Sequence, residues 1–242
     1  MKHFKISAVV AIIIANIAMF IVQSATGGIS GWFTQNLMLI SSDVFTRPWI
    51  LVTSMFLHGS IWHLFFNVYV LFIFGSLVEQ AIGTRRFIGL YFISGILAAF
   101  IPTYTAALGA SGAVMGVVGM TIMLFPHLQV LFFFIIPMSM RTFGIVIVVI
   151  ETFFMINPFE TGIAHFAHLV GLACGLGYGN YLLKKKKDFT RRFAQGPYSS
   201  QAIRRDDERP KSKKRGEGAA HKSSDIEMSD EDVENYLRYG RI

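Results

Sequence analysis

The chain has 242 residues, of which 53% are hydrophobic and 15% charged, with a formal net charge of +7. Soluble domains carry about 25% charged residues, so this composition excludes an ordinary soluble protein and favours a polytopic membrane protein. Positive charge is concentrated at the C-terminal end, where residues from Lys184 onward hold 16 Lys or Arg against 11 Asp or Glu, a net +5. A basic segment after an apolar region favours contact with anionic lipid rather than with nucleic acid. We therefore expect Lys184–Lys187 to contact anionic lipid.

The first apolar run, Ile6–Val22, follows a short basic segment. A secretory signal peptide begins in the same way, but this run is long for one and no sharp Ala-x-Ala site follows it. We therefore predict a retained first transmembrane helix at about residues 6–25. The next segment, Gly28–Trp49, mixes Phe, Trp and Leu with Ser, Asn, Thr and Gly. That mixture is typical of a structure lying in the membrane interface.

Five further apolar stretches approach the length needed to cross about 30 Å of hydrocarbon. They complete a set of six predicted spans, at about residues 6–25, 61–81, 87–105, 111–125, 141–156 and 163–183. Between the fourth and fifth spans, Phe125–Met140 is too interrupted by proline to cross, so we predict a partly buried or interfacial connection. After Lys187 the apolar periodicity ends, which predicts a membrane domain of residues 1–187 and a charged, disordered tail of residues 188–242. A short helix at Asp225–Arg238 is an open alternative within that tail.

Lys and Arg alternate between the two sets of span ends. The basic ends are Lys2 and Lys5, Arg85 and Arg86, Arg141, and Lys184–Lys187. The other ends, at residues 26–45, 103–108 and 157–162, carry neither Lys nor Arg. Since basic loops remain in the cytoplasm, six spans with both termini cytoplasmic satisfy every loop. We expect a plasma-membrane protein of this topology.

Several polar side chains fall at one depth in this topology, near the outer face. Ser111 begins the fourth span, His63 and Asn67 lie at the start of the second, and His165 and His168 begin the sixth. Spaced four residues apart, His63 and Asn67 share one helical face. Because polar groups inside a bilayer are costly, they indicate a functional site.

Glycines give the fourth and sixth spans small faces beside these polar residues. At about 100° per residue, His168 lies on the glycine-bearing face of the sixth span. Small residues allow close approach of two helices, so we predict that the spans pack together with Ser111 opposite His168. The glycines of these faces are Gly112 and Gly116 on the fourth span and Gly171 and Gly175 on the sixth.

This constellation favours nucleophilic acyl transfer. A serine hydroxyl becomes nucleophilic when an imidazole takes its proton, and the resulting oxyanion needs fixed donors. Candidate donors are His63, the Asn67 amide and the backbone N–H groups at the start of the fourth span. Glu151 is the one acidic residue that lies toward the same face, and nothing in the sequence ties it to an imidazole. A Ser111–His168 dyad is therefore the economical interpretation.

These residues resemble the rhomboid family of intramembrane serine proteases, over about 150 residues from Arg47 to Leu183. Singly each motif is weak, but four in order on the expected spans are specific. The matching motifs are Gly109-x-Ser111-Gly112, His63-x-x-x-Asn67, His168-x-x-Gly171-x-x-x-Gly175, and Gly75-x-x-x-Glu79-x-x-x-Gly83.

The resemblance implies an all-α polytopic membrane protein, a six-helix rhomboid bundle with a membrane-embedded first loop and a disordered cytoplasmic tail. It implies that Ser111 is the nucleophile and His168 the general base. The oxyanion would be held by His63, Asn67 and the backbone around Gly109, Ala110 and Ser111. The reaction would be hydrolysis of a peptide bond in or beside a substrate's transmembrane helix, without a cofactor, and the fifth span and the loop Asn157–Thr161 would gate entry.

Two positions depart from the family's pattern. Trp49 is followed by Ile50 where the family often has Trp-Arg, with Arg47 on the other side. Met115 stands where an aromatic commonly stacks on the catalytic histidine, and its sulfur can pack on an imidazole.

Other readings of the polar cluster predict different features. A rhomboid-like protein that binds transmembrane clients without cleaving them usually lacks the serine or the histidine, and both are present here. A small transporter predicts internal repeats, and the sequence has none. A metal site is disfavoured because the chain lacks an H-E-x-x-H motif and no carboxylate or thiolate is expected within reach at that depth. We expect structural roles for His58, His165 and Glu79.

Overall fold

The computed structural model describes residues 7–100, 106–132, 135–157 and 164–195, with side chains described up to Lys187. The chain divides into two compact units, Met1–Asn180 and Tyr181–Ile242. Lys2, Lys5, most of the loop Asn157–Thr161 and the candidate helix Asp225–Arg238 lie outside the described residues.

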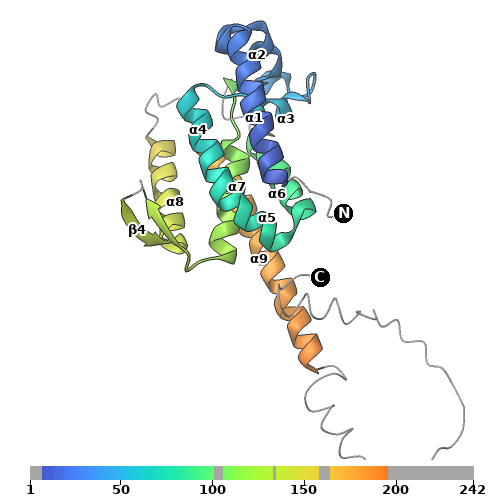
Figure 1. Ribbon diagram of the computed structural model, residues 1–242, viewed down its shortest axis with the longest axis vertical. Coiled ribbons are helices and arrows are strands. Elements are labelled where there is room, and N and C mark those ends of the chain that lie inside the picture. The colour runs from blue at the N-terminus through green and yellow to red at the C-terminus, as the bar shows by residue number, and fades with distance from the viewer. Residues whose placement is uncertain (1–6, 101–105, 133–134, 158–163, 196–242) are drawn as a thin grey trace, which may run out of the picture. The chain divides into compact units, whose positions relative to one another are not determined.

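Helices account for most of the described residues, and one lies at each of the six predicted spans (Figure 1). The second is a single helical stretch that contains a π-helical segment, a feature that often marks functional sites. The helices are α1 (Ala8–Ala25); α4 (Ile61–Val70), η4 (Leu71–Gly75) and α5 (Ser76–Ile82) in succession; α6 (Thr84–Phe100); α7 (Ser111–Leu124); α8 (Met140–Ile156); and α9 (His165–Gln195).

Two of these helices, Ala8–Ala25 and Ile61–Ile82, are both long and apolar enough to cross a membrane among the residues described. The shorter α7 is also apolar. The helix α9 continues to Gln195, twelve residues beyond the expected end of the sixth span at Leu183. Lys and Arg are good helix formers, so loss of apolar periodicity does not by itself end a helix.

The first loop, residues 26–60, is built from short helical turns and one strand rather than from a span. Ile50 is fully buried and packs with Leu39 and Val44, which anchors the loop. Trp32 and Phe45, in contrast, are 78% and 87% exposed. Exposed aromatic side chains suit the interfacial position predicted for this segment. Its elements are η1 (Gly28–Ser30), α2 (Trp32–Leu37), β1 (Leu39–Ile40), η2 (Ser41–Asp43), α3 (Ile50–Thr53) and η3 (Ser54–Phe56).

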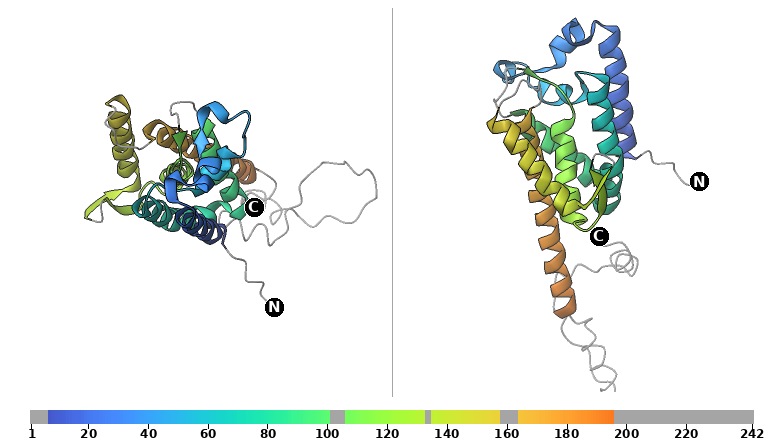
Figure 2. Two further views of the ribbon diagram at one scale, coloured as in Figure 1. Left: turned by 90° about the horizontal axis from the view of Figure 1, so that it is seen from above. Right: turned by 90° about the vertical axis from the view of Figure 1, so that its left-hand side faces the viewer.

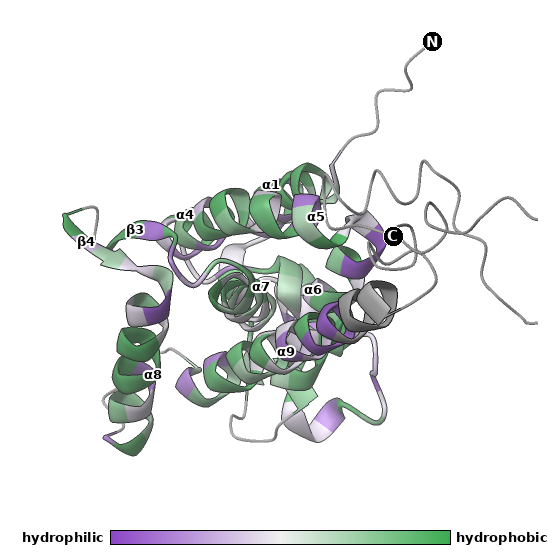
Figure 3. Ribbon diagram, turned by 90° about the horizontal axis from the view of Figure 1, so that it is seen from below, coloured by the Kyte–Doolittle hydropathy of each residue, from purple (hydrophilic) through white to green (hydrophobic). Residues whose placement is uncertain are grey.

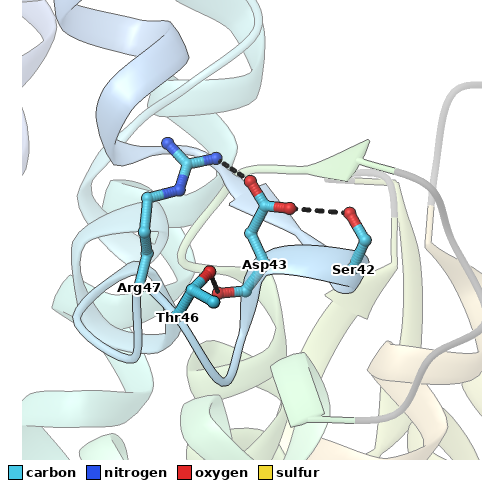
Figure 4. A network of polar contacts seen from close by, with 4 residues as sticks. All are labelled: Ser42, Asp43, Thr46 and Arg47. Atoms are coloured by element: carbon cyan, nitrogen blue, oxygen red, sulfur yellow. Dashed lines mark hydrogen bonds and ion pairs between the residues drawn. The ribbon is translucent and has the colours of Figure 1, made fainter.

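Arg47 is used within this loop in an ion pair with Asp43 (Figure 4). The Ser42 hydroxyl donates to the Asp43 carboxylate at 2.8 Å, and the Thr46 hydroxyl donates to the Asp43 backbone carbonyl at 3.1 Å. The hydrogen bonds that the Asp43 carboxylate accepts from Ser42 and Arg47, together with the charge of Arg47, lower the pKa of Asp43, with the Ser42 hydroxyl as the largest cause. The arginine therefore closes a local turn within the first loop.

The all-α expectation is wrong in two places, because the described residues include two short antiparallel sheets. In the first sheet, β1 pairs with β2 (Ala106–Ala107), with Leu39 opposite Ala107. In the second, β3 (Gln129–Phe132) pairs with β4 (Ile136–Ser139). The connection predicted as interfacial is thus a hairpin. Its Pro137 lies on a two-stranded ribbon, where a missing N–H is tolerated at an edge.

The helix α7 lies at the centre of the first unit, with α4, α6, α8 and α9 around it in the view along its axis (Figure 3). It contacts α6, α8, α5 and η4, and most of its residues are buried. The first loop lies at the end of the bundle where α7 begins, since β1 pairs with the strand that precedes α7 (Figure 2). This arrangement places the start of α7 beneath the loop.

Glu79 joins the opposite end of the bundle to α1. Its carboxylate accepts hydrogen bonds from the backbone N–H groups of Ala8 and Val9, at 2.9 and 3.1 Å. The hydroxyls of Ser7 and Thr84 donate to the same carboxylate, at 2.6 and 2.8 Å. A carboxylate at a helix N-terminus satisfies orphan donors and matches the helix dipole. These contacts are the kind that the structural role predicted for Glu79 requires.

Glycines at each end of the same motif permit this junction. A Cβ on Gly75 would lie 3.1 Å from both Leu71 and Val9, so its absence admits α1. Gly83 has a φ of 82° and ends α5. A left-handed residue at a helix C-terminus is usually glycine because a Cβ is strained there.

Candidate active site

Ser111 is the first residue of α7. The segment before it is held by the first loop, through the β1–β2 pairing and through the Gly109 N–H, which donates to the Ser54 carbonyl at 2.9 Å. Gly109 has a φ of 133°, which L side chains rarely adopt. The backbone N–H groups of the first helical turn have no acceptor within the helix. The serine hydroxyl therefore lies beside available backbone donors.

The predicted contact between the Ser111 and His168 helices is confirmed. A Cβ on Gly171 would collide with the backbone carbonyl of Gly112, and one on Gly175 with that of Gly116. The α-carbons of α9 therefore pack directly on the backbone of α7. This contact brings the N-terminal turns of the two helices together.

The lack of a Cβ on Gly112 and on Gly116 makes room for a different neighbouring helix than expected. A Cβ on Gly112 would lie 2.5 Å from the Cβ of Ala98, and one on Gly116 would overlap Ser94. Both Ala98 and Ser94 belong to α6. The α-carbons of these two glycines therefore pack against α6, and their carbonyls pack against α9. Helical periodicity alone does not tell which neighbour a small residue contacts.

His63 reaches the same place from α4. Its ring lies against Gly109, since a Cβ there would be 2.7 Å from Cε1 and 2.8 Å from Nε2. Its Nδ1 accepts a hydrogen bond from the Gly59 N–H at 3.4 Å, and the Ser60 hydroxyl caps the helix by accepting from the His63 N–H. An accepting Nδ1 leaves the proton of the neutral ring on Nε2. His63 thus presents a donor next to the backbone that precedes Ser111.

Asn67 is buried one turn below His63, and its amide donates to the His63 carbonyl at 2.8 Å. A primary amide has two N–H donors, so one remains for another acceptor. His58 is also buried, and its ring lies edge-on to that of His63 at 5.1 Å between centroids. Gln23 of α1 holds the His58 backbone by hydrogen bonds to its carbonyl and its N–H. Gln23 therefore holds the loop before α4, and the buried His58 ring packs at the loop–helix junction where a structural role is predicted.

Glu151 overturns the expectation that no acid lies near the histidines. Its Oε1 is 3.0 Å from Nδ1 of His168, and its Oε2 is 2.6 Å from Nδ1 of His165. The Glu151 and His165 residues are 8% and 7% exposed. The sequence contains one sign of this contact, which is an acidic residue inside an apolar span. The rotation of α8 that turns it toward α9 is a property of packing.

A further aromatic contact ties α8 to α9. The rings of Phe154 and His165 are stacked, with centroids 5.3 Å apart and planes 16° from parallel. His165 is therefore held on its ring face by Phe154 and at Nδ1 by the carboxylate of Glu151. Met115, which stands where the family commonly has an aromatic side chain, is half-buried on α7.

The three side chains Glu151, His165 and His168 also meet the distance requirement for a metal site, with potential ligand atoms within 4.8 Å of one another. A carboxylate does lie within reach of the histidines, contrary to the expectation that disfavoured a metal site. The 2.6 and 3.0 Å separations between carboxylate oxygens and imidazole nitrogens are those of hydrogen bonds. Hydrogen bonding accounts for the geometry without an ion.

Ser111 opens on a pocket between the first loop, α6 and α9. Among the residues described, Ser111 makes no hydrogen bond with His168. Catalytic hydrogen bonds are often formed only with substrate bound. The pocket is lined chiefly by small and apolar residues: Leu39, Ser54, Met55, Gly95, Ala98, Ala107, Leu108, Gly109, Ser111, Ala164 and Ala167, with Ser41, Ala99, Gly112 and Ala113.

A serine at a helix start, an imidazole on the adjoining helix and a second imidazole beside the preceding glycine form an arrangement suited to acyl transfer. The family model described as Rhomboid domain matches residues 45–185, more than half of the chain. The chain belongs to the rhomboid family. The match covers the region in which the sequence resemblance was found, so that resemblance is confirmed.

Curated rhomboid relatives from several organisms are similar to this rhomboid chain. The mitochondrial Rhomboid protein 1 of Saccharomyces cerevisiae is 33% identical over 111 residues, which is 42% of this chain and 32% of the relative. The mitochondrial Presenilin-associated rhomboid-like protein of Homo sapiens is 31% identical over 187 residues, covering 72% of this chain and 48% of the relative. The mitochondrial RHOMBOID-like protein 6 of Arabidopsis thaliana is 40% identical over 77 residues, which cover 30% of this chain and 25% of the relative.

The rhomboid chain spans less than half the length of each of these relatives. All three are named as mitochondrial, which overturns the expectation of a plasma-membrane location. The distribution of basic residues describes which loops share a side of a membrane. It carries no information about which membrane that is, and this is why the expectation failed.

Proposed function

We propose that this rhomboid protein is an intramembrane serine endopeptidase that uses Ser111 as nucleophile and His168 as general base. The observation that carries the proposal is the direct backbone contact between α7 and α9, where Gly171 packs on the Gly112 carbonyl. It brings the first turns of the two helices together, with Ser111 on one and His168 on the other.

In the proposed reaction, Nε2 of His168 takes the proton of the Ser111 hydroxyl as the oxygen attacks the scissile carbonyl. The resulting oxyanion accepts hydrogen bonds from Nε2–H of His63, the second amide N–H of Asn67 and the backbone N–H of Ser111. The imidazolium then protonates the leaving amine, and the peptide bond breaks. Water, deprotonated by the same imidazole, hydrolyses the acyl-enzyme and restores the serine.

Gly109 and Ala110 contribute to this site through the backbone. The positive φ of Gly109 turns the chain into α7, and Ala110 is the N-cap of that helix. Both residues are therefore needed to aim the N–H groups of the first turn toward the oxyanion. The lining of small residues beside Ser111 leaves room for an extended substrate backbone.

The substrates that we propose are transmembrane segments of membrane proteins. Six spans at the predicted positions would place Ser111, His63 and His168 at one depth, toward the side opposite the basic loops. Residues 1–187 would form the membrane domain, and Lys184–Lys187 would contact anionic headgroups. The names of the relatives support a mitochondrial membrane as the location.

The test is cleavage of a model single-span substrate by the purified full chain, beside Ser111→Ala and His168→Ala variants. Both variants should lose cleavage while keeping the wild-type thermal unfolding midpoint. Labelling of Ser111 by a fluorophosphonate that requires His168 would identify the nucleophile independently. Wild-type cleavage by either variant excludes the dyad. Binding of the substrate without any cleavage would instead favour the non-cleaving rhomboid-like alternative.

A further inference from the structure

The carboxylate of Glu151 lies between two imidazoles and uses one oxygen for each. Its Oε1 contacts Nδ1 of His168 at 3.0 Å, and its Oε2 contacts Nδ1 of His165 at 2.6 Å. An ionised carboxylate only accepts hydrogen bonds. Both histidines must therefore carry a proton on Nδ1, and in the neutral form each has its lone pair on Nε2.

The Nε2 lone pair is what a general base needs. An imidazole protonated on Nε2 cannot take the serine proton, so the tautomer of His168 decides whether the proposed dyad can react. When His168 accepts the proton of Ser111 it becomes an imidazolium with both nitrogens protonated. The carboxylate, already in place on the Nδ1 side, stabilises that charge without needing to move.

The second histidine fixes the carboxylate. The shorter contact of Glu151 is the one to His165 rather than the one to His168. His165 is itself buried, and its ring stacks on that of Phe154. Phe154 lies one turn along α8 from Glu151. Two attachments from α9 and the burial of the carboxylate leave it little rotational freedom, so the direction from Oε1 to His168 is fixed.

From this geometry we propose that Glu151 is a positioning residue for the reaction, which extends the Ser111–His168 pair to a Ser–His–Glu arrangement anchored by His165. The inference rests on the proposed serine-protease function. It gives α8 a role in the reaction in addition to any role in substrate entry.

The test compares Glu151→Gln, Glu151→Asp and His165→Ala in the purified full chain with the single-span substrate. An amide offers one acceptor where the carboxylate offers two, so Glu151→Gln cannot hold both imidazoles in the required tautomer. We expect kcat to fall by about 10²- to 10⁴-fold with KM unchanged, as for loss of general-base catalysis. Glu151→Asp keeps the charge and should recover part of kcat, and His165→Ala should lose less than Glu151→Gln.

Glu79→Gln is the matched control, because Glu79 is also a glutamate that is 8% exposed and accepts several hydrogen bonds. It should lower the thermal unfolding midpoint without changing kcat per folded molecule. A spectroscopic readout comes from nitrogen-15-labelled histidine, in which the Nδ1–H signal of His168 should be far downfield in the wild type and absent or shifted in Glu151→Gln.

The results separate the two proposals. If Ser111→Ala and His168→Ala are inactive while Glu151→Gln keeps the wild-type kcat and the same His168 signal, the positioning role is wrong and the dyad stands. If Ser111→Ala cleaves at the wild-type rate, the proposed function itself is wrong. One equivalent of metal in the purified protein, lost in His165→Ala, would also overturn the positioning role, because the three side chains would then be ligands.

Discussion

The ring of His63 lies against the α-carbon of Gly109, so closely that a Cβ on Gly109 would be 2.7 Å from the ring. The contact joins two motifs that are 46 residues apart in the sequence. It fixes the distance between the proposed oxyanion donor on α4 and the backbone that leads into Ser111.

Gly109→Ala should therefore impair the proposed activity more than stability alone would explain. The methyl group would displace the His63 ring and would strain a φ of 133°, at a stability cost of about 1–2 kcal/mol. We expect kcat to fall by about 10- to 100-fold as one oxyanion donor is misplaced. The control is Gly28→Ala, because Gly28 also has a positive φ but has open space around it. Equal loss of kcat per folded molecule in both variants would contradict the prediction.

Gly171→Ala should destabilise the contact between α7 and α9. Its methyl group would overlap the Gly112 carbonyl, and backbone cannot give way as the end of a flexible side chain can. Overpacking of this kind costs roughly 1–3 kcal/mol or more, so the thermal unfolding midpoint should fall. Gly177→Ala on the same helix meets nothing within 4 Å, and it should raise the midpoint by removing a helix glycine. A higher midpoint for Gly171→Ala would show that the helices are not packed backbone to backbone.

His63→Ala and Asn67→Ala should both reduce kcat while leaving KM nearly unchanged. Each removes a donor to the proposed oxyanion, and loss of one such donor costs about 10²- to 10³-fold in kcat. Asn67→Ala also breaks the hydrogen bond to the His63 carbonyl, so its effect should partly overlap with that of His63→Ala. Steady-state kinetics of the single and double variants measure the overlap. Full additivity would mean that the two side chains act independently.

Acid should destabilise the protein through His58. Burial, and then the neighbouring charge of His63, lower the pKa of His58 from 6.5 to about 4. Between these values the unfolded chain binds a proton that the folded chain does not, so the free energy of unfolding falls as pH decreases through this window. The loss amounts to about 3 kcal/mol once pH is below the folded pKa, and above 6.5 the group makes no pH-dependent contribution.

The thermal unfolding midpoint of the wild type between pH 7 and pH 4 measures this effect. In His58→Leu the titrating group is absent while the backbone can keep its two hydrogen bonds to Gln23. The midpoint of that variant should depend less on pH over the same window. An identical slope in the two proteins would assign the acid sensitivity to other groups.

The sequence by itself determined that a helix lies at each predicted span, that the chain resembles the rhomboid family, and that α7 packs on α9. Apolar runs and helical periodicity are local properties, and the repeated spacing of Gly171 and Gly175 marks a close-packed face wherever it occurs. The candidate residues Ser111, His168, His63 and Asn67 were found in the same way, from residue type, spacing and the depth at which charged loops place them.

The tertiary structure decided which residues meet across elements. The pairing of Leu39 with Ala107 joins segments 68 residues apart, and nothing in either segment specifies the other. The contact of Glu151 with His168 depends on how α8 is rotated, and an apolar helix without a pronounced polar face leaves that rotation open. Packing against α9 turns the one carboxylate in α8 toward two imidazoles, because a buried charge is stable only where it is paired.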